Sequence, residues 1–133
     1  MTLFGALIPF CDHCGIEEVG MVEGATRLRV AAGPHLENNM GIAHGGLICT
    51  LLDVAMGTAA RTQAGVPVMT LDMQVSFLSP GRGPLLGEGR VTKAGRSILF
   101  CEAVVTREQD GEVVARSTGI FKPVRPRGDA AAS

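Results

Sequence analysis

The hydrophobic and polar positions divide the chain into two regions with different periods. Residues 47–60 are almost wholly apolar. A helix is expected over residues 47 to about 63, and Ala64-Gly65 follows as a helix end. Beyond position 66 the pattern is typical of strands separated by turn residues. Strands are expected at 68–78, 85–93, 97–107 and 112–122. In the first of these, Leu71, Met73, Val75 and Phe77 share one parity, so they are expected on one face.

Two shorter β-branched runs precede the long helix. Residues 16–22 and 25–32 flank Glu23-Gly24, which predicts a hairpin. Further upstream, Leu3, Phe4, Leu7 and Ile8 have helical spacing, so a short helix is expected within residues 2–11.

This order of elements predicts an α+β fold. A helix that is apolar nearly all round needs cover on most sides, so the long helix should be wrapped by a mostly antiparallel sheet of about five to six strands. The length of 133 residues fits one domain, expected over 1–123. Residues 124–133 have little apolar content and are expected to form a short flexible tail. An exposed edge strand would favour pairing with a second copy.

One carboxylate, Asp53, lies in the middle of the apolar helix. At helical spacing it shares a face with Thr50 and Gly57, and that face carries no Lys or Glu. We therefore expect Asp53 to look into a cleft or a subunit interface, where it could act as a general base. An Asp that is merely satisfied by a buried hydrogen bond fits the composition about equally well. Gly57 costs about 1 kcal/mol relative to Ala, which suggests a close approach at that point.

The loop before the helix offers complementary groups. Gly45 and Gly46 at a helix N-terminus expose N–H groups suited to a developing negative charge. Asn38 could position a water or a carbonyl, and His44 could be an acid/base or could fix the loop by hydrogen bonding.

Composition narrows the function classes. The net charge of −1 and the lack of Trp and Tyr argue against a nucleic-acid partner or an anionic membrane surface. The apolar run near the N-terminus is too short for a signal peptide or a membrane span, so a cytoplasmic protein is expected. Cys11-Asp-His-Cys14 could be a redox pair or half of a zinc site, but an incidental pair is favoured because no second close pair follows. Neither metal nor cofactor is expected.

Together, Asn38-x-x-Gly41-x-x-His44-Gly45-Gly46 with Asp53 nine residues after the histidine resembles the hotdog-fold acyl-CoA thioesterases of the PaaI-like, phenylacetate-pathway family. Segments 69–73 and 77–80, and the turn at 93–97, are similar to that family too, so the resemblance covers roughly 9–122. It implies that a long central helix is wrapped by the sheet. It also implies that Asp53 activates water or attacks the thioester, and that the Gly45 N–H polarises its carbonyl. Asn38 would help to hold the water or the carbonyl, and the Thr70 hydroxyl would lie near that water.

The resemblance further implies a site shared between subunits. Asp53 and Thr70 of one subunit would face Asn38, His44 and Gly45 of the other, in a homodimer or homotetramer. Residues expected to bind coenzyme A or the acyl group are Gly46, Phe77, Ser79, Pro80, Arg82, Lys93, Gly95, Arg96 and Ser97. Arg82, Lys93 and Arg96 are the expected phosphate partners, although ordinary surface charge explains them as well, Arg82 above all.

The function expected from this resemblance is hydrolysis of acyl-CoA or aryl-CoA thioesters. The alternative is a hotdog module that binds acyl-CoA without turnover, against which both Asp53 and Thr70 argue. Hotdog dehydratases place a His after the helix Asp, and no His follows Asp53 here. The preferred acyl group cannot be read from the sequence, and the phenylacetate label does not define it.

Overall fold

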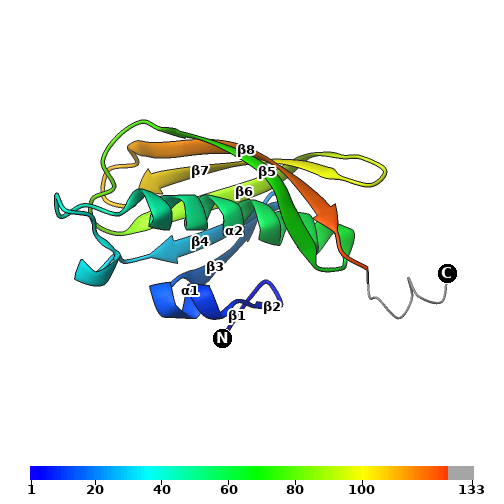
Figure 1. The fold of residues 1–133 in the computed structure, drawn as a ribbon, viewed down its shortest axis with the longest axis horizontal. Helices are drawn as coiled ribbons and strands as arrows, with labels where there is room; N and C mark the ends of the chain where they lie inside the picture. Colours follow the sequence, from blue (N-terminus) through cyan, green and yellow to red (C-terminus); the bar gives the residue numbers. More distant parts are fainter. Residues whose placement is uncertain (126–133) are drawn as a thin grey trace.

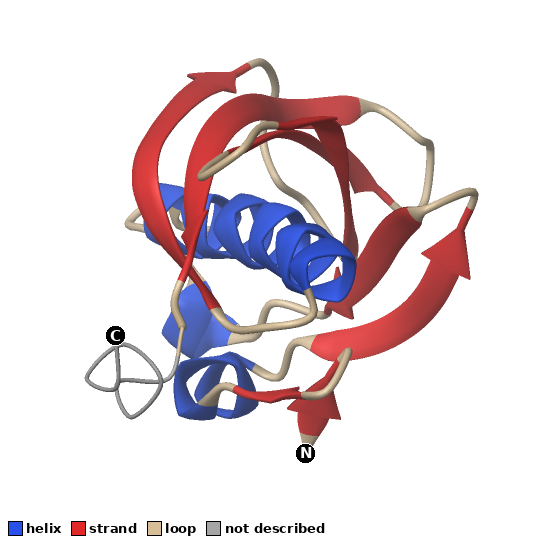
Figure 2. Cartoon of the chain, turned by 90° about the vertical axis from the view of Figure 1, so that its right-hand side faces the viewer, coloured by secondary structure: helices blue, strands red, loops and turns tan. Residues whose placement is uncertain are grey.

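The long helix and the sheet around it dominate the structure. The computed structural model describes residues 1–125, so most of the predicted tail lies outside the described residues. Helix α2 (Gly45–Ala64) packs against a six-stranded antiparallel sheet (Figure 1), which curves around it in Figure 2. In spatial order the strands are β3 (Glu17–Val22), β4 (Ala25–Val30), β6 (Leu85–Ala94), β7 (Leu99–Arg107), β8 (Val113–Pro123) and β5 (Val68–Phe77). The α+β hotdog arrangement predicted from the sequence is confirmed.

The N-terminal segment differs from its prediction. Residues 2–11 do not form a helix but the small hairpin β1 (Thr2–Leu3) and β2 (Ala6–Leu7), followed by helix α1 (Pro9–Cys14). Phe4 and Gly5 form the turn with φ of 49° and 84°, a left-handed conformation that a non-glycine residue rarely adopts. Pro9 opens α1 because its missing N–H is not needed in the first turn of a helix.

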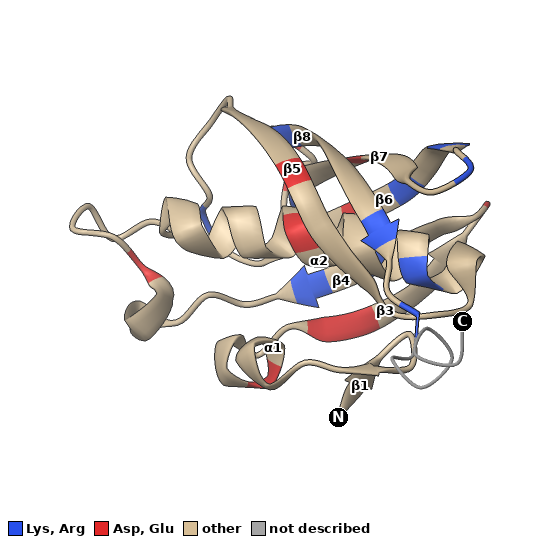
Figure 3. Ribbon diagram, turned by 45° about the vertical axis from the view of Figure 1, so that its right-hand side comes forward, with Lys and Arg blue, Asp and Glu red and all other residues tan. Residues whose placement is uncertain are grey.

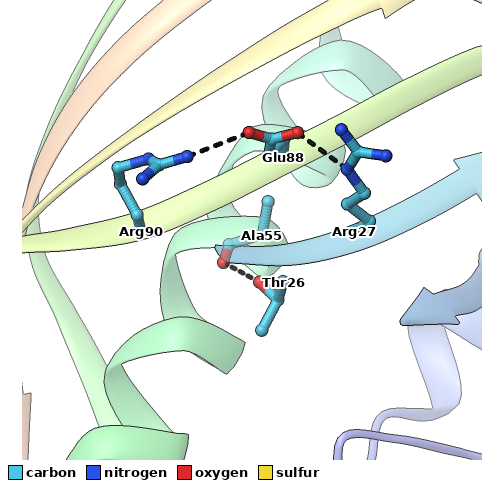
Figure 4. Close-up of polar contacts among 5 residues, drawn as sticks. All are labelled: Thr26, Arg27, Ala55, Glu88 and Arg90. Carbon is cyan, nitrogen blue, oxygen red and sulfur yellow. Dashed lines mark hydrogen bonds and ion pairs between the residues drawn. The ribbon is translucent and has the colours of Figure 1, made fainter. Parts of the chain in front are cut away.

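Helix α2 approaches the sheet closely at β6. A Cβ built on Gly89 would lie 2.3 Å from the carbonyl carbon of Ala55, so this position of β6 requires glycine. On the neighbouring strand β4, the buried Thr26 hydroxyl donates to the Ala55 carbonyl oxygen at 2.8 Å (Figure 4). On the outer face of the sheet, Glu88 instead pairs with Arg27 and Arg90 at 2.8 and 3.1 Å. At this contact the helix, whose apolar side chains fill the core, is held by close backbone approach and buried hydrogen bonds rather than by charge.

We expect Thr26→Val to lower the free energy of unfolding by about 1 kcal/mol, because the side chain keeps its shape but loses its hydrogen bonds to Ala55 and Thr58. Urea denaturation measures this, with Thr118→Val as the control because Thr118 is exposed on β8. Equal midpoints for the two variants would show that the buried hydroxyl contributes nothing.

Strand β5 carries a bulge that the alternating sequence pattern did not reveal. Thr70 pairs with Phe121 of β8 and Asp72 pairs with the next residue along, Ile120, so Leu71 is the extra residue. The predicted common face for Leu71 and Met73 is wrong, because the bulge changes the parity and leaves Leu71 50 % exposed. The same change turns Thr70 toward α2.

Candidate active site

Asp53 and Thr70 form the chemical centre of the candidate site. The Thr70 hydroxyl donates to Asp53 Oδ1 at 2.6 Å, which joins the middle of α2 to the bulged start of β5. Asp53 is partly exposed rather than buried. Both side chains line an open cleft, whose other walls include Ala6 of β2, Ile8 just before α1, and Phe121 of β8. The carboxylate is therefore both oriented by a hydroxyl and accessible to a ligand.

The loop before α2 is held by its own polar side chains. Asn38 Oδ1 accepts hydrogen bonds from the N–H groups of Met40 and Ile42 at 2.9 and 3.3 Å. This leaves the Asn38 amide nitrogen, a donor, as the group that could face a ligand. His44 is the N-cap of α2, and its Nδ1 accepts from the Gly46 N–H at 2.8 Å. Of the two roles considered for His44, the structure shows the loop-fixing one.

Gly45 keeps a backbone donor unused. The N–H groups of Leu47 and Ile48 donate to the His44 carbonyl, and that of Gly46 is taken by the His44 ring. In the part of the chain that the structure describes, the Gly45 N–H has no acceptor. A Cβ at Gly45 would meet the Phe77 ring at 3.6 Å, so Phe77 lies directly beside this donor. Gly45 N–H therefore stands at the positive end of the α2 dipole, where it could receive an oxyanion.

The two groups of predicted catalytic residues do not meet within one chain. Gly45 and Asp53 are eight positions apart on the same helix, which corresponds to about 12 Å along its axis. To act on one carbonyl, the Gly45 nitrogen would have to lie about 3 Å from the carbonyl oxygen. The Asp53 side chain would have to reach the carbonyl carbon of the same group at a similar distance. One chain therefore cannot use both groups on the same carbonyl.

The residues predicted to bind coenzyme A also fall at separate places. Ser79 and Pro80 lie in the loop after β5, where the Ser79 hydroxyl donates to the Val113 carbonyl at 2.5 Å and Arg107 contacts the Pro80 carbonyl. Arg82 is exposed in the same loop.

The other predicted set lies in the turn between β6 and β7. It contains Lys93, Gly95, Arg96 and Ser97, and Figure 3 shows positive charge at this hairpin. The ten residues of β6, roughly 33 Å, separate it from the Arg82 loop.

Cys11 and Cys14 are buried thiols in this fold. Burial is the main cause that raises the pKa of Cys11 to about 11, and burial also raises the pKa of Cys14, so both thiols are protonated at neutral pH. Within residues 1–125 no group of three or more His, Cys, Asp and Glu side chains could hold a metal ion. Both cysteines pack in the core.

Sequence reasoning did not single out Arg61 as a site residue. It lines the same cleft as Asp53, and its Nη1 donates to the Phe4 carbonyl at 3.0 Å. The signal was available, because residues 53, 57 and 61 are spaced four apart and share one helix face.

The chain is similar to known thioesterases in sequence and in fold. Residues 40–114 match the thioesterase superfamily. The chain is 31 % identical over 85 residues to human acyl-coenzyme A thioesterase 13, covering 59 % of each protein. The solved structure of the BH2602 protein from Bacillus halodurans with CoA has a TM-score of 0.82 and 29 % identity, and covers 91 % of this chain and 82 % of that one. The PaaI protein of E. coli shares the fold, with a TM-score of 0.81 and 22 % identity over 89 % of this chain and 86 % of that one.

This chain belongs to the thioesterase superfamily, and it is a thioester hydrolase. Among the described residues, no helix is long and apolar enough to span a membrane.

Proposed function

We propose that this protein hydrolyses acyl-CoA or aryl-CoA thioesters to the free acid and coenzyme A, with Asp53 as general base or nucleophile. The observation that carries the proposal is the Thr70–Asp53 hydrogen bond of 2.6 Å beside an open cleft. A carboxylate oriented by a hydroxyl and reachable from solvent suits a base better than a structural residue.

In the general-base route, Asp53 takes a proton from a water while the water oxygen forms a bond to the thioester carbon. Thr70 donates its hydroxyl proton to Asp53, so the lone pairs of the Thr70 oxygen are free to accept a hydrogen bond from that water. The carbonyl oxygen becomes an oxyanion held by the Gly45 N–H, with the Asn38 amide nitrogen as a further donor. The C–S bond then breaks, and the coenzyme A thiolate leaves with the proton that Asp53 returns. In the nucleophilic route, the Asp53 carboxylate attacks the same carbon, and the C–S bond breaks as the coenzyme A thiolate leaves. Water then hydrolyses the resulting mixed anhydride to the free acid and regenerates the Asp53 carboxylate.

We propose that two copies complete each site, because Gly45 and Asp53 of one chain are about 12 Å apart. Strand β5, which carries Thr70, is an edge of the sheet. It exposes Met69, Leu71 and Phe77 to between 50 and 55 %, an apolar edge suited to covering by a second copy. A homodimer or homotetramer with sites at the dimer interface follows from this proposal.

The same pairing would unite the two coenzyme A segments. If the Gly45 end of one copy lies beside Asp53 of the other, the loop with Ser79, Pro80 and Arg82 approaches the partner's β6–β7 hairpin. Lys93 and Arg96 would then contact phosphates from that hairpin, with Gly95 and Ser97 shaping the turn.

A thiol-release assay over short, medium, long and aromatic acyl-CoAs tests the function. We expect turnover of at least one class, with release of one thiol for each acid formed. Tight acyl-CoA binding without thiol release across the whole series would instead establish a non-catalytic binding module.

A further inference from the structure

Three residues on one face of α2 form a row that runs from Asp53, the proposed base, to the guanidinium of Arg61. Asp53, Gly57 and Arg61 are spaced four apart, so they lie one above another on the same helix face. All three line the cleft described above. Asp53 and Arg61 are roughly 12 Å apart along the helix axis, and the side chains of a helix tilt toward its N-terminus, which directs Arg61 back toward Asp53.

Gly57 leaves the middle of this row bare. A Cβ at Gly57 would have Phe121 Cε2 at 3.4 Å as its one neighbour within 4 Å in the described structure, so packing does not demand glycine here. Glycine is nevertheless less favourable than alanine inside a helix. Its effect is to keep the floor of the cleft open between the carboxylate and the guanidinium.

The walls between these two charged groups are apolar. They include Ile8, Val54, Val68 and Phe121. Thr58 also lines the cleft, but its hydroxyl donates to the Val54 carbonyl and contacts the buried Thr26, so it is occupied.

At the far end, Arg61 is partly buried and uses Nη1 on the Phe4 carbonyl. It forms no ion pair with any side chain in residues 1–125. A guanidinium has five N–H donors in a planar fork, so most of its donors are available to a planar anion.

We propose that this row is the acyl subsite, and that Arg61 selects acyl groups ending in a carboxylate, that is, CoA monothioesters of dicarboxylic acids. The inference rests on the proposed function. The thioester carbon lies at Asp53, the methylene chain runs over Gly57 between the apolar walls, and the terminal carboxylate receives two parallel hydrogen bonds from Arg61. The β6–β7 hairpin does not line this cleft, which favours the acyl group over the coenzyme A phosphates as its occupant.

The test compares acyl groups of equal chain length that differ in the terminal carboxylate: glutaryl against pentanoyl, adipyl against hexanoyl, and suberyl against octanoyl CoA. We expect kcat/KM of the wild type to favour the dicarboxylic member of at least one pair. Arg61→Met should lower that ratio by roughly 10- to 100-fold, the range for a lost charge-assisted hydrogen bond. Arg61→Lys keeps the charge without the planar fork and should lie between the two.

A matched control is needed because Arg61 also holds the N-terminal turn, and loss of that turn could change activity by itself. Glu18 accepts the Phe4 N–H at 2.7 Å without lining the cleft, so Glu18→Ala loosens the turn that Arg61 also holds. We expect Glu18→Ala to leave the ratio as in the wild type. The proposal is overturned if Glu18→Ala shifts the ratio as much as Arg61→Met does.

Two further outcomes also overturn it. One is a wild type with no dicarboxylic preference in any pair. The other is an equal rise of KM for both members of every pair in Arg61→Met, which would assign Arg61 to coenzyme A. Turnover of other acyl-CoAs with no thiol released from any of the six thioesters would also overturn the proposal. Failure to release thiol from every member of the wider series, aromatic acyl-CoAs included, would instead refute the proposed function.

Discussion

Asp53→Asn should reduce kcat by roughly 10²- to 10⁴-fold, the range that a positioned general base contributes. Asparagine has nearly the same shape as aspartate, and its carbonyl oxygen can still accept from the Thr70 hydroxyl, so the local structure is retained. The amide cannot take a proton from water at neutral pH, nor attack a thioester as a carboxylate does. Stopped-flow or steady-state measurement of thiol release, with the substrate for which the wild type has the highest kcat/KM, gives the size of the effect.

The control for this change lies on β5, close in sequence to Thr70. Asp72 is exposed and does not line the Asp53 cleft, so Asp72→Asn removes the same charge with no loss of the base. We expect Asp72→Asn to turn over as the wild type does, and both variants to elute at the wild-type size in gel filtration. Full activity in Asp53→Asn would mean that the Thr70–Asp53 hydrogen bond is structural, which the composition of the helix allowed.

The fold was predictable from the sequence because its main signals are long and periodic. A mostly apolar stretch of helical length, closed by Ala64-Gly65, defines α2, and four alternating stretches define β5 to β8. The failures are local. Phe4 adopts a left-handed conformation that its residue type disfavours, and hydrogen bonds from distant residues hold it there: Glu18 accepts its N–H, and Arg61 donates to its carbonyl. Such contacts carry no signal in a short window of sequence.

The sequence singled out Asp53 and Thr70, which the structure brings together, but their geometry was not predictable from it. The bulge at Leu71 has no compositional marker, yet it turns Thr70 toward Asp53. The sequence also could not tell that Asn38 and His44 use an acceptor atom each to fix the loop. These details decide which atoms remain for a ligand: the Asn38 amide nitrogen and the Gly45 N–H.

Gly45→Pro should reduce kcat by roughly 10²- to 10³-fold, the cost of removing one oxyanion donor. The substitution deletes the Gly45 N–H, the donor without an acceptor in the described chain. Proline is tolerated at the first position of a helix, and the preceding residue, His44, has φ of −64° and ψ of 141°, the extended conformation that proline requires before it. The fold should therefore persist while the donor is lost.

Gly45→Ala is the matched control, since it adds a Cβ in ordinary contact with Phe77 but keeps the N–H. The kcat of Gly45→Ala should exceed that of Gly45→Pro by most of the roughly 10²- to 10³-fold expected for the lost donor. Equal losses in the two variants would attribute the effect to crowding at Phe77 rather than to the missing donor.

Co-expression of Gly45→Pro with Asp53→Asn tests whether each site needs two chains. In a mixed dimer, the Asp53 of the Gly45→Pro chain faces the Gly45 of the Asp53→Asn chain, so one of its two sites is intact. Random pairing should restore about a quarter of the wild-type activity from two nearly inactive chains. If each site lay within one chain, every site would carry a defect and the mixture would remain inactive. Because about 12 Å of helix separates Gly45 from Asp53, we expect restoration.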